Sequence, residues 1–174
     1  MKKKSQKKVQ PPLNQRRLKE LLHYDPDTGI FRWKVYRKRS KAAPGDVAGK
    51  RHPSQKYVRI GFDGWMWPAH RLAFLYMIGR WPEQIVDHID RNPLNNRWSN
   101  LREATHSQNR FNSKMTVRNK TGFKGVSPEG NRWIASIMVS GESHYLGCFA
   151  TPEEAHRAYC KAAQKIAGEF ARAQ

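Results

Sequence analysis

The chain has 174 residues, and its 33 Lys and Arg against 14 Asp and Glu give a formal net charge of +19. This length allows one ordinary domain or two small ones, and 38% hydrophobic residues can supply a modest core for each. Such a charge predicts a polyanionic partner. No apolar run approaches the ~20 residues of a membrane-spanning helix, so we expect no membrane partner. The chain has two cysteines and no Cys-x-x-Cys motif, which excludes a zinc-ribbon scaffold. A reducing cytoplasm fits this low number, and both cysteines are expected to pack as small apolar side chains.

The first twelve residues are predicted to be a basic, disordered tail. Five of the first eight residues are lysines, which is typical of the start of a signal peptide, but Val9-Gln10-Pro11-Pro12 follows where an apolar stretch would be needed, so no secretory signal is expected. The tail can be a solubilising segment or a phosphate-binding arm, and we expect both roles.

Residues 13–79 show alternating helix and strand patterns. Leucines 13, 18, 21 and 22 predict a helix over 13–23, a turn follows at 25–29, and alternation over 30–35 predicts a half-buried strand. Arg37–Arg51 is a basic loop, either solvated or a phosphate track, and the large positive charge favours the track. Asp63-Gly64 predicts a hairpin whose Trp65 and Trp67 belong to the core rather than to a base-stacking platform. A buried helix over 69–79 should end at Gly79.

The central block, residues 85–113, has a strand–loop–strand–helix pattern. A short apolar strand leads into Asp87-His88, an Asn-rich loop follows, and residues 101–104 are predicted to form a return strand. Thr105 and Gln108 have the spacing of a capping box, which puts Asn109 in the first turn of the next helix.

These residues suit the hydrolysis of a phosphodiester bond. His88 can take a proton from water, and Asp87 with the amide oxygen of Asn109 can hold Mg²⁺, which needs few protein ligands. Asn100 could accept from the Nδ1–H of His88 and leave Nε2 to face the water. A structural histidine is the alternative, and the three matching polar positions favour the catalytic interpretation.

The block resembles the HNH endonucleases of phages and mobile introns. The matching features are Asp87-His88, the run 95–102 (Asn-Asn-Arg-Trp-Ser-Asn-Leu-Arg), and the asparagines at 100 and 109; the stretches 69–73 and 21–31 also match. The resemblance covers roughly residues 13–113. It implies a ββα-metal finger with His88 as general base, Asn100 as its orienting partner, and Asp87 and Asn109 as ligands of one divalent metal. Other members carry His at the position of Asn109, and the amide here favours Mg²⁺ or Mn²⁺ over Zn²⁺ or Ni²⁺.

Other polar residues near the block have simpler interpretations. His70 could touch the scissile phosphate, but capping or packing near the site is favoured. Asp90 and Asn92 could be metal ligands, although the pattern is more typical of a turn. His106, at the start of a helix, is expected to be exposed.

A second module is predicted after a linker at 114–120. Residues 123–127, 132–139 and 144–149 have strand patterns, and a capping box at Thr151 opens a helix whose stripe is Ala155, Ala158, Tyr159, Ala162 and Ile166. Segments 122–126, 131–137, 145–149 and 151–159 resemble the AP2 DNA-binding domain. Alternation places Trp133, Ala135, Ile137 and Val139 against the helix. The positions expected to face DNA are Lys124, Arg132, Ser136, Met138 and Tyr145. Because Ser136 and Met138 cannot make the bidentate guanine contacts of Arg, we expect weak sequence specificity.

The sequence therefore predicts an α+β protein with four parts: a tail (1–12), an HNH endonuclease domain (13–113), a linker (114–120) and an AP2-like domain (121–174). We expect a monomeric, Mg²⁺-dependent homing-type endonuclease acting on double-stranded DNA in a bacterial cytoplasm, encoded by a phage. One alternative is a non-catalytic DNA-binding regulator on the same scaffold, and a weaker one is an RNA-binding protein.

Overall fold

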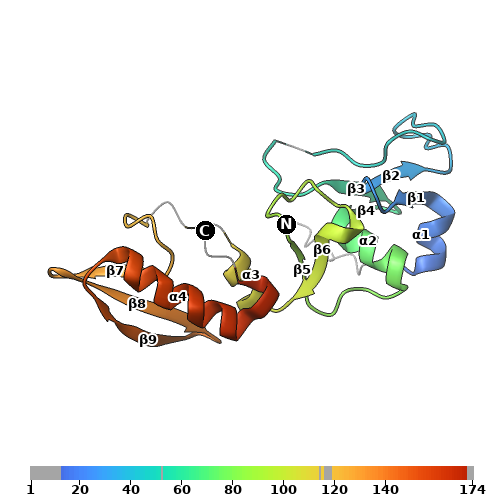
Figure 1. The fold of residues 1–174 in the computed structure, drawn as a ribbon. Coiled ribbons are helices and arrows are strands. Elements are labelled where there is room, and N and C mark those ends of the chain that lie inside the picture. The colour runs from blue at the N-terminus through green and yellow to red at the C-terminus, as the bar shows by residue number, and fades with distance from the viewer. Residues whose placement is uncertain (1–12, 52, 114, 116–118, 172–174) are drawn as a thin grey trace, which may run out of the picture. The chain divides into compact units, whose positions relative to one another are not determined.

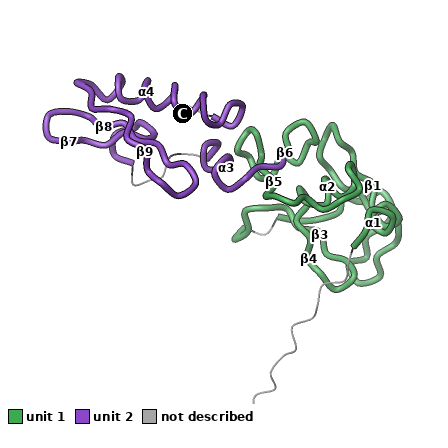
Figure 2. The backbone as a smooth tube through the Cα atoms, turned by 90° about the horizontal axis from the view of Figure 1, so that it is seen from below, with its two compact units in different colours: residues 1–101 green, residues 102–174 purple. Residues whose placement is uncertain are grey.

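The structure is a computed structural model that describes residues 13–51, 53–113, 115 and 119–171. The predicted tail and most of the predicted linker lie outside the described residues. The chain divides into two compact units, residues 1–101 and 102–174 (Figure 2).

Unit 1 begins with a short helix and a hairpin. Helix α1 (Gln15–Leu21) starts at Asn14, whose side chain accepts a hydrogen bond from the Arg17 N–H. The predicted helix over 13–23 is correct in its middle but too long, because Leu22 already belongs to strand β1 (Leu22–Asp25), which pairs with β2 (Ile30–Trp33). The predicted turn at 25–29 joins the two strands, so pairing with β2 ends the helix.

A second hairpin leads into the main helix of unit 1. Strands β3 (Arg59–Phe62) and β4 (Trp65–Pro68) pair around Asp63 and Gly64, both with positive φ, as the turn residues predicted. Helix α2 (Ala69–Ile78) follows and ends at Gly79 in the left-handed conformation, which confirms that prediction. Trp67 is buried and Trp65 packs against the core, so both belong to it as expected.

The core of unit 1 collects apolar side chains from both hairpins and both helices. Helix α2 buries Leu72, Ala73, Phe74 and Leu75 against them. This core fixes the positions of the segments that follow: strand β5 (Ile85–His88) and the turn η1 (Trp98–Asn100). Strand β6 (Leu101–Ala104) and helix α3 (His106–Asn112) come next, in the predicted order.

Unit 2 contains a three-stranded antiparallel sheet with a helix on one face. The strands are β7 (Val126–Glu129), β8 (Arg132–Val139) and β9 (Glu142–Phe149), and α4 (Pro152–Ala167) lies along the sheet before the turn η2 (Gly168–Phe170) (Figure 1). Two strands differ from the predicted ranges: β7 starts later than 123 and β9 starts earlier than 144. The three-strands-plus-helix architecture itself is confirmed.

The packing of α4 differs in detail from the predicted stripe. The buried positions are Ala155, Tyr159, Ala163 and Ala167. Ile166 is 47% exposed, so its assignment to the stripe was wrong. A row spaced by four residues, three of them alanine, lets the helix lie close to the sheet, and the larger Ile166 falls beside that row.

No helix among the described residues is long and apolar enough to span a membrane. Cys148 and Cys160 are both free thiols in partly buried positions, as predicted.

Candidate active site

Strand β5 places two ionisable side chains in the interior at its end. Asp87 and His88 are each 5% exposed, although they are neighbours on a strand. A buried carboxylate beside a buried imidazole is costly without partners, so such a pair is more typical of a site than of a core.

His88 is held by an amide, but not by the one that the sequence predicted. Its Nε2 lies 3.1 Å from Oδ1 of Asn96, which is itself buried. With an oxygen acceptor at Nε2, the neutral ring carries its proton there and its lone pair on Nδ1. The predicted tautomer, with Nδ1 held and Nε2 facing water, is therefore reversed.

Asn100 instead organises the loop between β5 and β6. Its Oδ1 accepts from the Asp90 N–H at 3.0 Å, and its Nδ2 donates to Asp90 Oδ1 at 3.0 Å and to the Asn95 carbonyl at 2.8 Å. Because both its Oδ1 and its Nδ2 form hydrogen bonds within the loop, Asn100 stabilises the conformation of the loop. Its predicted bond to the His88 ring was wrong.

Asp90 belongs to the same network, as the turn interpretation predicted. Its carboxylate accepts from the Asn92 N–H at 2.8 Å and from Asn95 Nδ2 at 2.7 Å. Burial raises the pKa of Asp90, but the hydrogen bonds from Asn95, Asn92 and Asn100 outweigh it and lower this pKa overall. The carboxylate is thus occupied in holding the loop.

The backbone of Asn96 is fixed by the first hairpin of the chain. The hydroxyl of Tyr24, on β1, donates to the Asn96 carbonyl at 2.6 Å. Gly29 packs so closely that a Cβ there would lie 2.3 Å from the Asn96 carbonyl carbon, and its φ of 73° also favours glycine. The loop residue that holds His88 is therefore clamped from a segment more than sixty residues earlier in the chain.

A second buried imidazole lies beside the first. The His70 ring centroid is 5.3 Å from that of His88, and the Tyr57 ring lies 4.6 Å from His70 and 6.0 Å from His88. His70 is 7% exposed, and its Nδ1 has no hydrogen-bond partner in the described part of the chain. The sequence prediction that His70 packs near the site is confirmed.

Burial controls the charge of both rings. It lowers the pKa of His70 to about 3, with His88, Arg71 and Lys56 adding to the effect. Burial also lowers the pKa of His88, although Asn96, Asp90 and Asp87 oppose the shift. Both imidazoles are therefore neutral at pH 7, and a neutral His88 is the form that can accept a proton.

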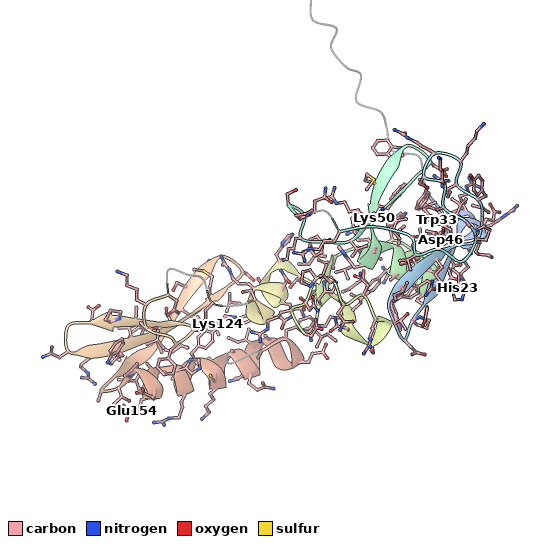
Figure 3. The ribbon with its side chains drawn as sticks, turned by 90° about the horizontal axis from the view of Figure 1, so that it is seen from above. His23, Trp33, Asp46, Lys50, Lys124 and Glu154 are labelled. Carbon is pink, nitrogen blue, oxygen red and sulfur yellow. The ribbon has the colours of Figure 1, made fainter. Side chains whose placement is uncertain are left out.

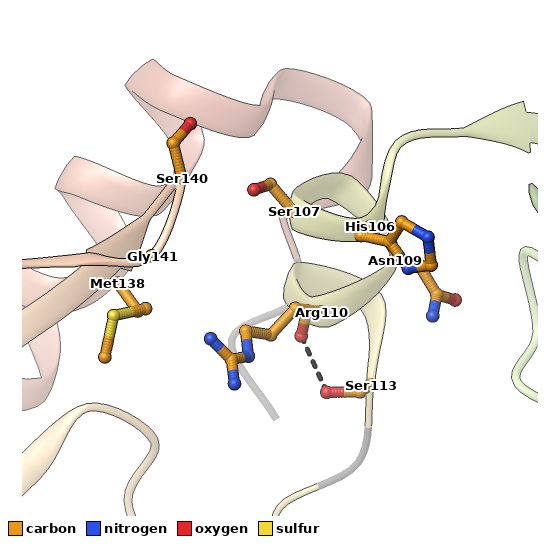
Figure 4. A pocket seen from close by; sticks show the side chains of 8 residues that line it. All are labelled: His106, Ser107, Asn109, Arg110, Ser113, Met138, Ser140 and Gly141. Atoms are coloured by element: carbon orange, nitrogen blue, oxygen red, sulfur yellow. Dashed lines mark hydrogen bonds between the residues drawn. The ribbon is translucent and has the colours of Figure 1, made fainter. Parts of the chain in front are cut away.

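Asn109, the other predicted metal ligand, lies in unit 2. The Thr105–Gln108 capping box starts α3 as predicted and leaves Asn109 in its first turn. Asn109 also lines a cavity of about 570 Å³ between α3 and the β8–β9 turn, and His106, exposed as predicted, lies on the same rim (Figure 4).

The donor chemistry fits a small hard cation. Asp87 offers a buried carboxylate and Asn109 an amide oxygen, which are donors that Mg²⁺ or Mn²⁺ accepts while keeping several waters. In the described ranges no three His, Cys, Asp or Glu side chains gather as a metal cluster.

The side chains predicted to face DNA have different surroundings. Met138 is 40% and Tyr145 65% exposed, Arg132 is also exposed, and Ser136 is half-buried. Ala135 and Ile137 are buried, which confirms the alternation along β8.

Lys124 is the exception in this set. Its ammonium donates to the carbonyls of Arg110, Phe111 and Ser113 at 2.7–3.1 Å. These carbonyls lie at the C-terminal end of α3, where a cation is favourable. Because all three N–H groups donate to these carbonyls, Lys124 caps the C-terminal end of α3. Its assignment to the DNA-facing set was wrong.

Comparison with known proteins identifies the region around β5. The family model described as HNH endonuclease matches residues 68–111, which include Asp87, His88, Asn96, Asn100 and Asn109. Residues 68–111 are therefore similar to the HNH endonuclease family.

Two relatives come from viruses. An Acanthamoeba polyphaga mimivirus protein named "uncharacterized HNH endonuclease" is 40% identical over 114 residues, 64% of this chain and 59% of its own length. "Protein 3.8" of an Escherichia phage is 39% identical over 61 residues, 34% of this chain and 50% of its own length. The chain thus spans about half to three-fifths of the curated relatives that it matches.

Proposed function

We propose that the protein is a divalent-metal-dependent endonuclease that hydrolyses phosphodiester bonds in double-stranded DNA. The observation that carries the proposal is the buried Asp87-His88 pair, with the imidazole neutral and held at Nε2 by Asn96, inside the HNH domain. The net charge of +19 suits a polyanionic substrate.

His88 is the general base of this reaction. Asn96 favours the tautomer with its lone pair on Nδ1, and that nitrogen takes the proton from the attacking water. The water oxygen forms a bond to phosphorus, the bond from phosphorus to the 3′ oxygen breaks, and the leaving oxygen takes a proton from solvent. The products are a 5′-phosphate and a 3′-hydroxyl.

Asp87 and Asn109 are the residues that would hold the metal, and Mg²⁺ is the ion that their oxygens suit best. When bound there, a divalent cation supplies positive charge to the pentacoordinate phosphate and to the leaving oxygen. Asn100 acts through the loop: with Asp90 it keeps Asn96 and His88 in register.

The sheet of unit 2 is the proposed DNA-docking module, and its likeness to AP2 domains belongs to the same proposal. Support comes from the exposure of these side chains: Arg132, Met138 and Tyr145 are exposed and Ser136 is half-buried. Only one of these four carries charge, so the docking is expected to tolerate many sequences. We also propose a phage-borne, homing-type enzyme of the bacterial cytoplasm that works as a monomer and therefore nicks one strand at a time.

Supercoiled plasmid with Mg²⁺ tests the proposal. We expect conversion to the open-circular form, loss of activity on chelation, and at least a hundredfold loss in His88→Ala, in line with general-base contributions of about 10²–10⁴. His23→Ala is the matched control, because His23 is an exposed histidine of the same unit as His88. Tight, salt-sensitive binding without any cleavage would replace the proposal with the non-catalytic alternative, and equal cleavage by His88→Ala would remove His88 as the base.

A further inference from the structure

Unit 1 contains a groove away from the buried Asp87-His88 pair. It has a volume of about 780 Å³ and lies between the basic loop that follows β2 and the β3–β4 hairpin. Figure 3 labels three of its lining residues: Trp33, Asp46 and Lys50.

The groove is strongly basic. Four cations line it, namely Lys41, Lys50, Arg51 and Arg59, against the single carboxylate of Asp46. That carboxylate already accepts a hydrogen bond from the Ala43 N–H at 2.7 Å. Within the ranges that the structure describes, none of the four cations forms an ion pair. Unpaired cations that converge on one groove predict an anionic ligand with several charges.

The groove also exposes apolar surface between these charges. Val47 and Met66 are each 55% exposed, and Trp33 lies beneath with only 7% of its surface accessible. Gly61 makes room for Met66, because a Cβ at position 61 would lie 2.9 Å from the Met66 sulfur. Cations interleaved with small apolar patches match a chain of phosphates joined by deoxyribose rings.

One short segment connects the groove to the catalytic histidine. Gln55 and Arg59 line the groove, while Tyr57 between them stacks at 6.0 Å and 18° against the His88 ring. A polyanion bound along Arg59 therefore lies next to the segment that contacts the general base.

We propose that this groove binds the sugar–phosphate backbone of duplex DNA beside the phosphate that is cleaved. The proposal rests on the proposed function for its choice of ligand. The loop predicted as a phosphate track supplies three of the four cations, and Arg59 on β3 supplies the fourth.

The test compares matched pairs of charge-removing variants. Lys50→Gln with Arg59→Gln removes two groove cations, and Lys161→Gln with Lys165→Gln removes two exposed cations from α4. Each pair is made in His88→Ala, so that binding to a fluorescent duplex is measured by anisotropy without cleavage. Lys50→Arg with Arg59→Lys restores the charge, and thermal melting checks that every variant is folded.

Loss of two phosphate contacts lowers the slope of log K against log salt by about 1.8. When the salt concentration rises from 50 to 200 mM, the affinity of the parent should therefore fall by a factor about tenfold larger than that of the groove variant. In the catalytically intact protein, the groove pair should raise KM with little change in kcat, because binding rather than chemistry is removed. The charge-restored variant should behave as the parent.

Equal salt-dependence slopes for the groove variant and the α4 variant would refute the proposal that the groove binds DNA, even if the parent protein cleaves DNA. If only the groove variant changes the slope but the parent protein does not cleave DNA, the groove is supported as a DNA-binding site and the proposed endonuclease function is refuted. Tighter binding of duplex RNA or of anionic vesicles than of duplex DNA, lost in the same groove pair, would overturn the choice of ligand.

Discussion

The bond between Asn96 and His88 offers the sharpest test of the proposed chemistry. Asn96→Ala removes the oxygen that lies 3.1 Å from Nε2 and leaves a buried ring N–H without that acceptor. An unsatisfied buried donor costs about 1–3 kcal/mol, which corresponds to roughly 5- to 150-fold in rate if the cost falls on the reactive tautomer. The loop itself should persist, because Tyr24 and Gly29 hold the backbone of residue 96 rather than its side chain.

Single-turnover cleavage of plasmid between pH 5 and 9 measures this effect. We expect Asn96→Ala to cleave more slowly at every pH and to lose less stability than Asn100→Ala, because only one side-chain hydrogen bond is removed. Asn100→Ala should instead lose both rate and stability, because three hydrogen bonds of the loop are lost.

Asn96→Asp separates positioning from mere packing. The carboxylate keeps an acceptor at Nε2 but favours the imidazolium, so it raises the pKa of His88. The base works only when neutral, and the acidic limb of the rate profile should therefore move to higher pH than in the parent. An unchanged rate in Asn96→Ala together with an unmoved limb in Asn96→Asp would refute the assignment of Asn96 as the residue that positions the base.

Three further substitutions test contacts that the sequence alone did not reveal. Tyr24→Phe should destabilise the protein by about 1–3 kcal/mol in urea unfolding, since the buried Asn96 carbonyl loses its donor, whereas Tyr36→Phe at an exposed site should be neutral. Gly29→Ala should cost more than Gly64→Ala, because both have positive φ but only Gly29 has backbone within 3 Å of the new methyl group; equal losses would mean that the Asn96 contact is unimportant. Lys124→Met should lower the melting temperature and weaken amide-exchange protection in α3, and an effect on DNA affinity without loss of stability would restore Lys124 to the DNA-facing set.

Local features of the fold could be predicted because a few neighbouring residues determine them. The capping boxes at Thr105 and Thr151, the Asp63-Gly64 turn and the end of α2 at Gly79 all depend on contacts within four residues. The backbone requirement at each of these positions is visible in the sequence itself.

The role of each loop asparagine could not be predicted in the same way. Asn96 and Asn100 lie four residues apart in one polar loop, and both can hydrogen-bond to an imidazole. Tyr24 and Gly29 decide between them by fixing the backbone of Asn96, and this choice depends on packing across about seventy residues. Lys124 is a similar case, because its partners at the end of α3 lie 11 to 14 residues away and give no periodic signal.

The residues that position His88, the proposed general base, extend beyond the segment that the HNH family model matches. That segment begins at residue 68, yet the clamp on Asn96 comes from Tyr24 and Gly29, and the ring stacked on His88 comes from Tyr57. In the proposed mechanism, Tyr24 and Gly29 therefore help to set the tautomer of the base through its partner Asn96. A fragment limited to residues 68–111 would keep Asp87, His88 and Asn109 but lose the contacts that hold Asn96, so its imidazole would no longer be locked at Nε2.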